Sequence, residues 1–218
     1  MTTPTTDPRI EDYVRSLLTR HDEPVLLEME AEAGRRGFPI VGRMVGVVLE
    51  ILARSIGAKR VFEMGSGFGY SAYWFSRAIG PEGTELYLTD GDPNNERMAL
   101  DFLHRAGLDG PVRTHVGDAV EHFNDTTGEF DIVFSDIDKQ GYPAAWEAAR
   151  ERIRLGGLYL CDNTLGFGAG RVIDERDGRA GEQLAAIRRH NELVAADGRY
   201  VSSILPIRDG VLTALRIA

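Results

Sequence analysis

Cysteine is almost missing from this sequence, and long apolar runs are missing altogether. Cys161 is the only cysteine among 218 residues, so an intrachain disulfide is excluded and a reducing, cytoplasmic compartment is expected. No stretch of about 18 apolar residues occurs, which excludes a membrane-spanning helix. The first ten residues, MTTPTTDPRI, have no apolar core. We therefore expect neither a signal peptide nor a membrane partner.

Positive charge is also in short supply. The chain has 25 lysine and arginine residues against 34 aspartate and glutamate residues, a net charge of −9. An acidic surface gives no general attraction to phosphate backbones, which disfavours a nucleic-acid partner. It does not forbid a local basic strip, for which Arg35-Arg36, Arg43 and Lys59-Arg60 are candidates, although a solvated surface explains them more simply.

The N-terminal quarter of the chain has a helical pattern. Apolar side chains recur at helical spacing from residue 10 to residue 57, which predicts a helical N-terminal extension over residues 1–57. This extension covers a functional site, pairs with another subunit or only adds a packing layer. We expect residues 58–218 to form the main part of one compact domain.

After residue 58 the pattern changes to short β-rich runs that alternate with helical stretches. The expected strands span residues 60–63, 85–90, 112–116, 130–136 and 158–162, and the expected helices span residues 70–80, 93–106, 118–124, 140–154 and 174–196. Such alternation predicts an α/β fold with a mostly parallel sheet between two helical layers. Residues 200–207 and 211–217 flank the turn signal Arg208-Asp209-Gly210, so the sheet should end in an antiparallel hairpin.

A glycine-rich segment follows the first expected strand. It reads EMGSGFGYS from Glu63 to Ser71, with Gly65, Gly67 and Gly69 at the spacing G-x-G-x-G. Glycines here let the chain turn sharply and bring backbone N–H groups against a ligand at the next helix N-terminus. The spacing differs from the G-x-G-x-x-G pattern of dinucleotide sites. A tight strand-to-helix turn without a ligand is the alternative interpretation.

Two further features favour a nucleoside ligand. Asp90 ends the second strand, where an acidic side chain can accept hydrogen bonds from both ribose hydroxyls. Gly117-Asp118-Ala119 follows the third strand, where a loop can contact an adenine edge. Asp118 as a simple helix N-cap explains that segment equally well.

Acidic and amide side chains follow the fourth and fifth strands. Asp136 ends one strand, and Asp162 and Asn163 end the other. Ligands of open α/β sheets lie beyond the carboxyl ends of the strands, and neighbouring strands lie about 4.8 Å apart. If these two strands are neighbours, Asp136 and Asp162 converge, and two carboxylates that close favour a hard divalent cation, with the Asn163 amide oxygen as a third ligand. Taken singly, each residue is also explained as a helix cap or turn residue.

These residues resemble the cation-dependent O-methyltransferases, the family of catechol and caffeoyl-CoA O-methyltransferases. The resemblance covers residues 38–218. The family's first loop reads E-x-G-x-x-x-G-Y-S, which Glu63–Ser71 matches. The resemblance implies a Rossmann-like class I methyltransferase fold with seven strands in the order 3-2-1-4-5-7-6, the last-numbered strand antiparallel. It also implies S-adenosylmethionine (SAM) as cofactor and a homodimer.

The same resemblance assigns roles to individual residues. Gly65, Ser71 and the Val41-Gly42 backbone would hold the methionine part of SAM, and Asp90 would hold its ribose. The predicted cofactor-binding residues are Val41, Glu63, Gly65, Gly67, Gly69, Tyr70, Ser71, Asp90, Gly117, Asp118, Ala119 and Asp136. Asp136, Asp162 and Asn163 resemble the family's metal ligands, with Mg²⁺ expected and Mn²⁺ or Ca²⁺ as alternatives. Lys139 resembles its catalytic base.

The predicted reaction is methyl transfer to an acceptor hydroxyl. A phenol-like hydroxyl is mostly protonated at neutral pH, and a divalent cation eases the loss of its proton. Lys139 would take that proton, and alignment of the two reactants would supply much of the rate. We expect a catechol-like small molecule as acceptor. The alternatives are the wobble 5-hydroxyuridine of tRNA, SAM binding without catalysis, and a nicotinamide enzyme.

The sequence departs from the family pattern beside the predicted acceptor site. Asp138 stands where catechol enzymes carry an aromatic residue, and residues 166–170 are rich in glycine where many relatives carry bulky residues. Both departures bear on which acceptor the protein takes.

Overall fold

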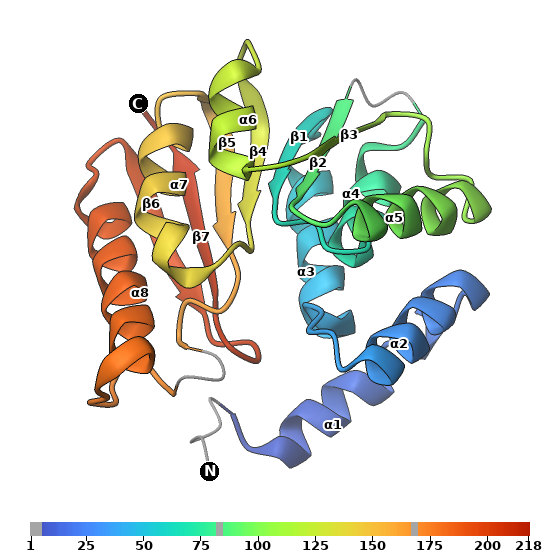
Figure 1. Cartoon of the computed structure of the whole chain (residues 1–218), viewed down its shortest axis with the longest axis horizontal. Coiled ribbons are helices and arrows are strands. Elements are labelled where there is room, and N and C mark those ends of the chain that lie inside the picture. Colours follow the sequence, from blue (N-terminus) through green and yellow to red (C-terminus); the bar gives the residue numbers. More distant parts are fainter. Residues whose placement is uncertain (1–5, 82–84, 167–169) are drawn as a thin grey trace.

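A seven-stranded sheet separates two layers of helices in the computed structural model, which describes residues 6–81, 85–166 and 170–218 (Figure 1). The strands are β1 (Arg60–Met64), β2 (Glu85–Asp90), β3 (Val112–Val116), β4 (Phe130–Ser135), β5 (Ile153–Cys161), β6 (Tyr200–Leu205) and β7 (Val211–Arg216). Their order is β3-β2-β1-β4-β5-β7-β6, and β7 runs antiparallel to both of its neighbours. The predicted fold class, strand order and terminal hairpin are confirmed.

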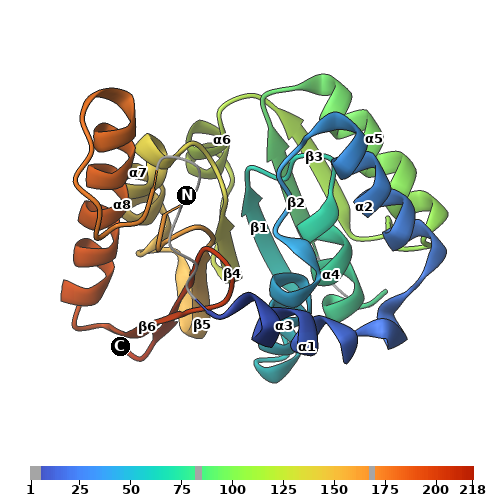
Figure 2. The same cartoon turned by 90° about the horizontal axis from the view of Figure 1, so that it is seen from below.

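One face of the sheet is covered by α3 (Gly42–Ser55), α4 (Tyr70–Ile79) and α5 (Pro93–Arg105). The other face is covered by α6 (Ala119–Asp125), α7 (Tyr142–Ala149) and α8 (Gly178–Ala196), as Figure 2 shows. The central strands contribute buried apolar side chains to both faces, such as Val61 to the first core and Phe62 to the second. Burial on two sides explains why their sequences are almost continuously apolar.

The N-terminal extension packs outside the first helical layer. It begins with α1 (Pro8–Ser16) and a 3₁₀ turn, η1 (Thr19–His21), and continues with α2 (Pro24–Arg36). Leu26 and Met29 of α2 are fully buried in the core that α4 and α5 share, whereas α1 buries none of its side chains. The extension therefore does add a packing layer, and the loop from α2 to α3 continues toward the functional site.

The fifth strand begins earlier than the sequence pattern predicts. The expected helix 140–154 ends at Ala149, and β5 starts at Ile153 rather than at residue 158. Ile153 pairs with Phe130, and an irregularity in the register separates this pair from the regular ladder. The pairing partner decides the strand's start, which the local sequence does not reveal. Helix α8 likewise begins at Gly178 rather than at residue 174.

The structure describes only the ends of the glycine-rich segment 166–170. Residues 167–169 of the glycine-rich segment lie outside the described residues. In the described parts of the chain, no helix combines the length and the apolar character that crossing a membrane requires.

Candidate active site

Three strands end at the same level of the sheet. Met64 of β1 pairs with Ser135 of β4, and Ser135 pairs with Cys161 of β5. The next residue of each strand, Gly65, Asp136 or Asp162, therefore stands in one row along the carboxyl edge. Backbone hydrogen bonds continue the ladder there: the Asp136 N–H lies 2.8 Å from the Met64 oxygen, and the Asp162 N–H lies 3.1 Å from the Ser135 oxygen.

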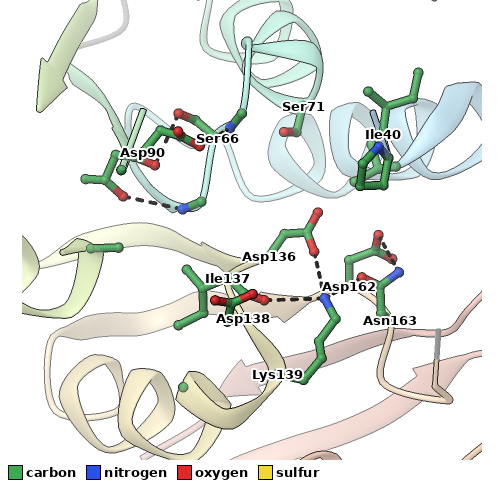
Figure 3. A pocket seen from close by; sticks show the side chains of 18 of the residues that line it. Ile40, Ser66, Ser71, Asp90, Asp136, Ile137, Asp138, Lys139, Asp162 and Asn163 are labelled. Carbon is green, nitrogen blue, oxygen red and sulfur yellow. Dashed lines mark hydrogen bonds and ion pairs between the residues drawn. The ribbon is translucent and has the colours of Figure 1, made fainter. Parts of the chain in front are cut away.

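A cavity of about 1010 Å³ opens above this row. Ten of the twelve predicted cofactor-binding residues line it, together with the three predicted metal ligands and Lys139: Val41, Gly65, Gly67, Tyr70, Ser71, Asp90, Gly117, Asp118, Ala119, Asp136, Lys139, Asp162 and Asn163. Figure 3 shows the glycine loop and Asp90 on one side of the cavity and the residues of β4 and β5 on the other. The loop before α3 supplies Ile40 and Val41 to the same wall.

Gly65 occupies a position that only glycine can fill. Its φ is +84°, and a Cβ built there would lie 2.5 Å from the carbonyl oxygen of Asp136. A side chain at this point would both strain the backbone and push β1 away from β4. The first glycine of the loop thus lets two strand ends approach closely.

Asp90 is held rigidly at the end of β2. Its Oδ2 accepts a hydrogen bond from the Gly67 N–H at 3.0 Å, and its Oδ1 accepts from the Asp92 N–H and the Asn95 amide. These donors fix the carboxylate at the cavity wall, where the sequence places a ribose contact. On the opposite segment, Asp118 accepts from two N–H groups at 2.9 Å and caps α6, so the N-cap interpretation is confirmed while Asp118 also lines the cavity.

Glu63 and Gly69 lie behind the cavity wall rather than on it. Gly69 is the N-cap residue of α4, and its missing side chain leaves room for Ala99. Glu63 is fully buried and accepts a hydrogen bond from the Ser71 hydroxyl, and Ser71 does line the cavity. Burial raises the pKa of Glu63 to about 8. Glu63 therefore orients Ser71 from below.

Glu63→Gln is expected to stabilise the protein in alkaline solution. A carboxyl whose pKa is raised on folding contributes its stability at low pH and loses it as pH rises from about 4.5 to about 8. The variant lacks this loss, so its free energy of unfolding should exceed the parent's at pH 9 by on the order of 1–3 kcal/mol, and match it near pH 4. Urea unfolding at both pH values, with exposed Glu192→Gln as control, measures the difference. Parallel pH profiles of parent and variant would refute it.

Lys139 lies among the side chains that follow β4 and β5. Its ammonium donates to Asp136 Oδ1 at 3.2 Å, to Asn163 Oδ1 at 2.7 Å and to the Tyr142 hydroxyl at 2.7 Å. Tyr142 in turn donates to the Asp162 carbonyl oxygen at 2.8 Å. Figure 3 shows the lysine directed toward Asp136 and Asn163. The predicted base and the predicted metal ligands therefore form one cluster.

Burial makes negative charge costly in this cluster, a cost that a bound cation would offset. It raises the pKa of Asp162 to about 8, and the nearby charge of Asp136 adds to that rise. It also raises the pKa of Asp136, which the Lys139 ammonium opposes. Asn163 holds its side chain beside these carboxylates at a φ of +56°, a strained conformation that asparagine tolerates better than most residues and that is common at functional sites.

The donor set fits a hard divalent cation. Asp136 and Asp162 offer carboxylate oxygens and Asn163 an amide oxygen, the ligands that Mg²⁺, Mn²⁺ and Ca²⁺ prefer. The Lys139 ammonium already contacts two of the three, as a cation would. Among residues 6–81, 85–166 and 170–218, no three histidine, cysteine or carboxylate side chains form a metal-binding group. The set of Asp136, Asp162 and Asn163 is not such a group, because its third oxygen comes from an amide.

Sequence reasoning missed several residues of the cavity. Tyr142, which is fully buried behind the cavity wall and contacts Lys139, is predictable in hindsight because it follows Lys139 by three positions. Arg208 and Asp209 also line the cavity, although the sequence marks them only as turn residues. Arg179 and Gln183 reach it from α8, and no local signal distinguishes them.

Comparison with known proteins agrees with this geometry. A family model described as "O-methyltransferase" matches residues 21–217. The chain is 30% identical over 202 residues to the catechol O-methyltransferase of Niastella koreensis, a match that covers 90% of this chain and 89% of that protein. It is 30% identical over 181 residues to the caffeoyl-CoA O-methyltransferase of Populus kitakamiensis, covering 79% of this chain and 76% of that protein.

A solved structure gives the same result. The O-methyltransferase TomG of Streptomyces achromogenes, involved in tomaymycin synthesis and solved in complex with SAM, superposes with a TM-score of 0.84 at 28% identity, covering 96% of each chain. The family match spans nearly the whole chain and includes every strand end that lines the cavity. The chain belongs to the O-methyltransferase family.

Proposed function

We propose that this protein transfers a methyl group from SAM to a hydroxyl of a catechol-like small molecule, with the help of a divalent cation. The observation that carries the proposal is the cluster of Asp136, Lys139, Asp162 and Asn163 at the floor of a cavity. That cavity is also lined by a glycine loop and a fixed carboxylate, Asp90. The cavity thus offers adjoining binding sites for a methyl acceptor and a nucleoside donor.

The donor side supports SAM as the cofactor. A nucleoside can use the Asp90 carboxylate for its ribose hydroxyls, and Gly65, Ser66 and Gly67 of the glycine loop line the same cavity. Ser71, oriented by Glu63, provides a hydroxyl for the methionine end. The SAM complex of TomG, which shares this fold, supports the same assignment.

The acceptor side supports proton removal by Lys139. Its Nζ lies within hydrogen-bond reach of Asp136 and Asn163, so an acceptor hydroxyl beside those residues is also within reach of the lysine. When bound at Asp136, Asp162 and Asn163, a divalent cation supplies the electrostatic attraction that eases loss of that proton. Lys139 in its neutral amine form accepts the proton, and the cavity walls hold the oxygen in line with the donor methyl, which it takes as the S–CH₃ bond breaks.

The acceptor class rests on the relatives and on the size of the cavity. A volume of about 1010 Å³ exceeds what a nucleoside donor requires and leaves room for one small acceptor. The names of the Niastella and Populus proteins favour a vicinal-diol aromatic. The tRNA alternative has an acidic hydroxyl beside a carbonyl, which would use the same residues, but the chain's net charge of −9 disfavours it.

Methyl transfer from labelled SAM to two acceptor pools tests the proposal. One pool contains catechol-type phenols and the other contains tRNA that lacks the wobble methyl group, each with Mg²⁺ and with a chelator. We expect transfer to the phenols, lost on chelation and restored by Mg²⁺. Transfer to tRNA alone, with steep salt dependence, would show that the acceptor is tRNA and not a phenol. Transfer that ignores the chelator would refute the role of the metal.

We also propose that the protein is a homodimer, on the basis of an uncovered sheet face. Leu158, Leu215 and Val201 are register partners on the face that α3 and α4 cover elsewhere. Their exposed fractions rise from 4% at Leu158 to 36% at Leu215 and 60% at Val201. The helical layer thus stops short of β7 and β6, and apolar side chains remain exposed there. A second copy would bury them.

Val201→Lys is expected to shift the protein toward monomer, because a charge in the centre of an apolar interface must be desolvated. Sedimentation equilibrium on parent and variant measures the mass, and exposed Ser203→Lys, two residues along the same strand face, tests the extent of the interface. A monomeric parent at micromolar concentration would refute the dimer.

A further inference from the structure

The turn between β6 and β7 joins the two walls of the cavity through Arg208. The Arg208 guanidinium donates from Nη1 to the carbonyl oxygen of Ile40 at 2.9 Å and to that of Val41. Ile40 and Val41 belong to the loop before α3, which forms the cofactor-side wall, where Figure 3 labels Ile40. One charged side chain thus holds two consecutive peptide carbonyls of a segment far away in the sequence.

The same turn is fastened to the other wall. The Leu165 N–H donates to the Asp209 carbonyl oxygen at 2.8 Å, and the Thr164 N–H donates to the Gly210 carbonyl oxygen at 3.0 Å. The Asp209 carboxylate also forms an ion pair of 2.8 Å with Arg171. Residues 164 and 165 directly follow Asn163, so the turn is tied to the loop that carries the candidate metal ligands.

The backbone is shaped for this contact at both of its ends. Arg208 has a φ of +51°, in the left-handed region that glycine adopts readily and that an arginine adopts only with strain. Gly42 has a φ of +73°, and a Cβ built on it would lie 2.3 Å from Arg208 Nη1. A simple hairpin turn requires neither an arginine at that point nor space for it beside α3.

We propose that Arg208 is a positioning residue for methyl transfer. It holds the Ile40–Val41 backbone at a fixed place relative to Asp136, Asp162 and Asn163. The methionine end of the donor is thereby aligned with the acceptor site. The inference rests on the proposed function, because it takes Val41 as a donor contact. Its contacts with Ile40 and Val41 are to backbone carbonyl oxygens, so Arg208 acts on the donor through Val41.

The position of Arg208 predicts effects of opposite sign on the two ligands. Its guanidinium lines the same cavity as Asp136 and Asp162, and like positive charges repel, so it opposes the binding of a cation there. Removing it should weaken binding of the donor, whose wall loses its support, and strengthen binding of the metal. General damage to the fold would weaken both.

Arg208→Gly and Arg208→Lys test this with calorimetric titration of S-adenosylhomocysteine and, separately, of Mn²⁺ alone. For Arg208→Gly we expect the affinity for S-adenosylhomocysteine to fall about tenfold, the effect of one charge-assisted hydrogen bond, and the Mn²⁺ affinity to rise about threefold. Arg208→Lys keeps the charge but not the planar fork. It should weaken S-adenosylhomocysteine and leave Mn²⁺ binding at the parent level.

Glycine suits the φ of this turn, so Arg208→Gly should keep its melting temperature within about 4 °C of the parent's. Arg176→Gly, in an exposed loop, serves as control. If the parent binds S-adenosylhomocysteine and Arg208→Gly binds it equally well, the inference is overturned while the proposed function stands. An equal loss of both affinities also overturns it. A parent that does not bind S-adenosylhomocysteine refutes the proposed function itself.

Discussion

Lys139→Met is expected to lower kcat by roughly 10²–10⁴-fold, the usual contribution of a positioned general base. Methionine is an unbranched side chain of similar length that can neither take a proton nor carry a positive charge. Because the Lys139 ammonium contacts Asp136 and Asn163, its removal should also leave those oxygens more available, and Mn²⁺ affinity should rise. Steady-state kinetics at saturating SAM and phenol, with Mn²⁺ calorimetry, measure both effects.

A matched control exists because Lys59 is the only other lysine in the chain. It is exposed at the start of β1, away from the cavity, and Lys59→Met should keep full activity. Lys139→Arg keeps the charge but cannot act as a base at neutral pH, so it should be as inactive as Lys139→Met. Activity of Lys139→Arg near the parent's would show that the lysine contributes only its charge.

Asp162→Asn is expected to abolish metal-dependent activity, with a loss on the order of 10³-fold, because Lewis-acid stabilisation contributes several kcal/mol. The substitution preserves shape and replaces one of the two carboxyl groups with a neutral amide. Mn²⁺ affinity should therefore fall in the same variant, while S-adenosylhomocysteine still binds. Activity with and without Mg²⁺ and the two titrations separate these effects.

Asp12→Asn on the exposed α1 gives the control for the loss of one carboxylate. It should change neither activity nor Mn²⁺ affinity. An Asp162→Asn protein that keeps both its Mg²⁺ response and its Mn²⁺ affinity would exclude Asp162 as a ligand. Loss of S-adenosylhomocysteine binding as well would point to disruption of the whole cavity floor.

The sequence predicts the carboxyl edge of the sheet well, because buried parallel strands end in recognisable polar residues. Asp136 and Asp162 each follow an apolar run, and parallel strands bring such ends to one edge. That β4 and β5 are neighbours came from the family resemblance, since the spacing of the residues does not give strand order. The register pair Ser135 and Cys161 then places the two carboxylates side by side.

The cofactor wall was harder to predict from motifs. Glu63 belongs to the loop pattern that marks cofactor contacts, yet it lies under Ser71 rather than at the cavity. Side chains along a strand point alternately to its two faces. The complete burial of Glu63 depends in addition on what packs against its face, which the local sequence does not show. A local motif marks a residue that the site needs, but it does not show whether that residue contacts the ligand.

Long-range contacts account for the rest of what the sequence does not reveal. The early start of β5 depends on Phe130, its partner in β4. The role of Arg208 depends on a turn conformation and on two carbonyl groups in a loop that precedes the sheet. Neither has a periodic pattern or a short motif, so only the folded chain shows them.

A crystal structure with Mn²⁺ and S-adenosylhomocysteine tests the central claim most directly. The proposed function predicts an anomalous peak within about 2.6 Å of oxygen atoms from Asp136, Asp162 and Asn163, with the Lys139 ammonium moved off Asp136. The same crystal should hold the nucleoside against Asp90. A manganese peak elsewhere, or a site that stays without metal while S-adenosylhomocysteine is bound, would contradict it.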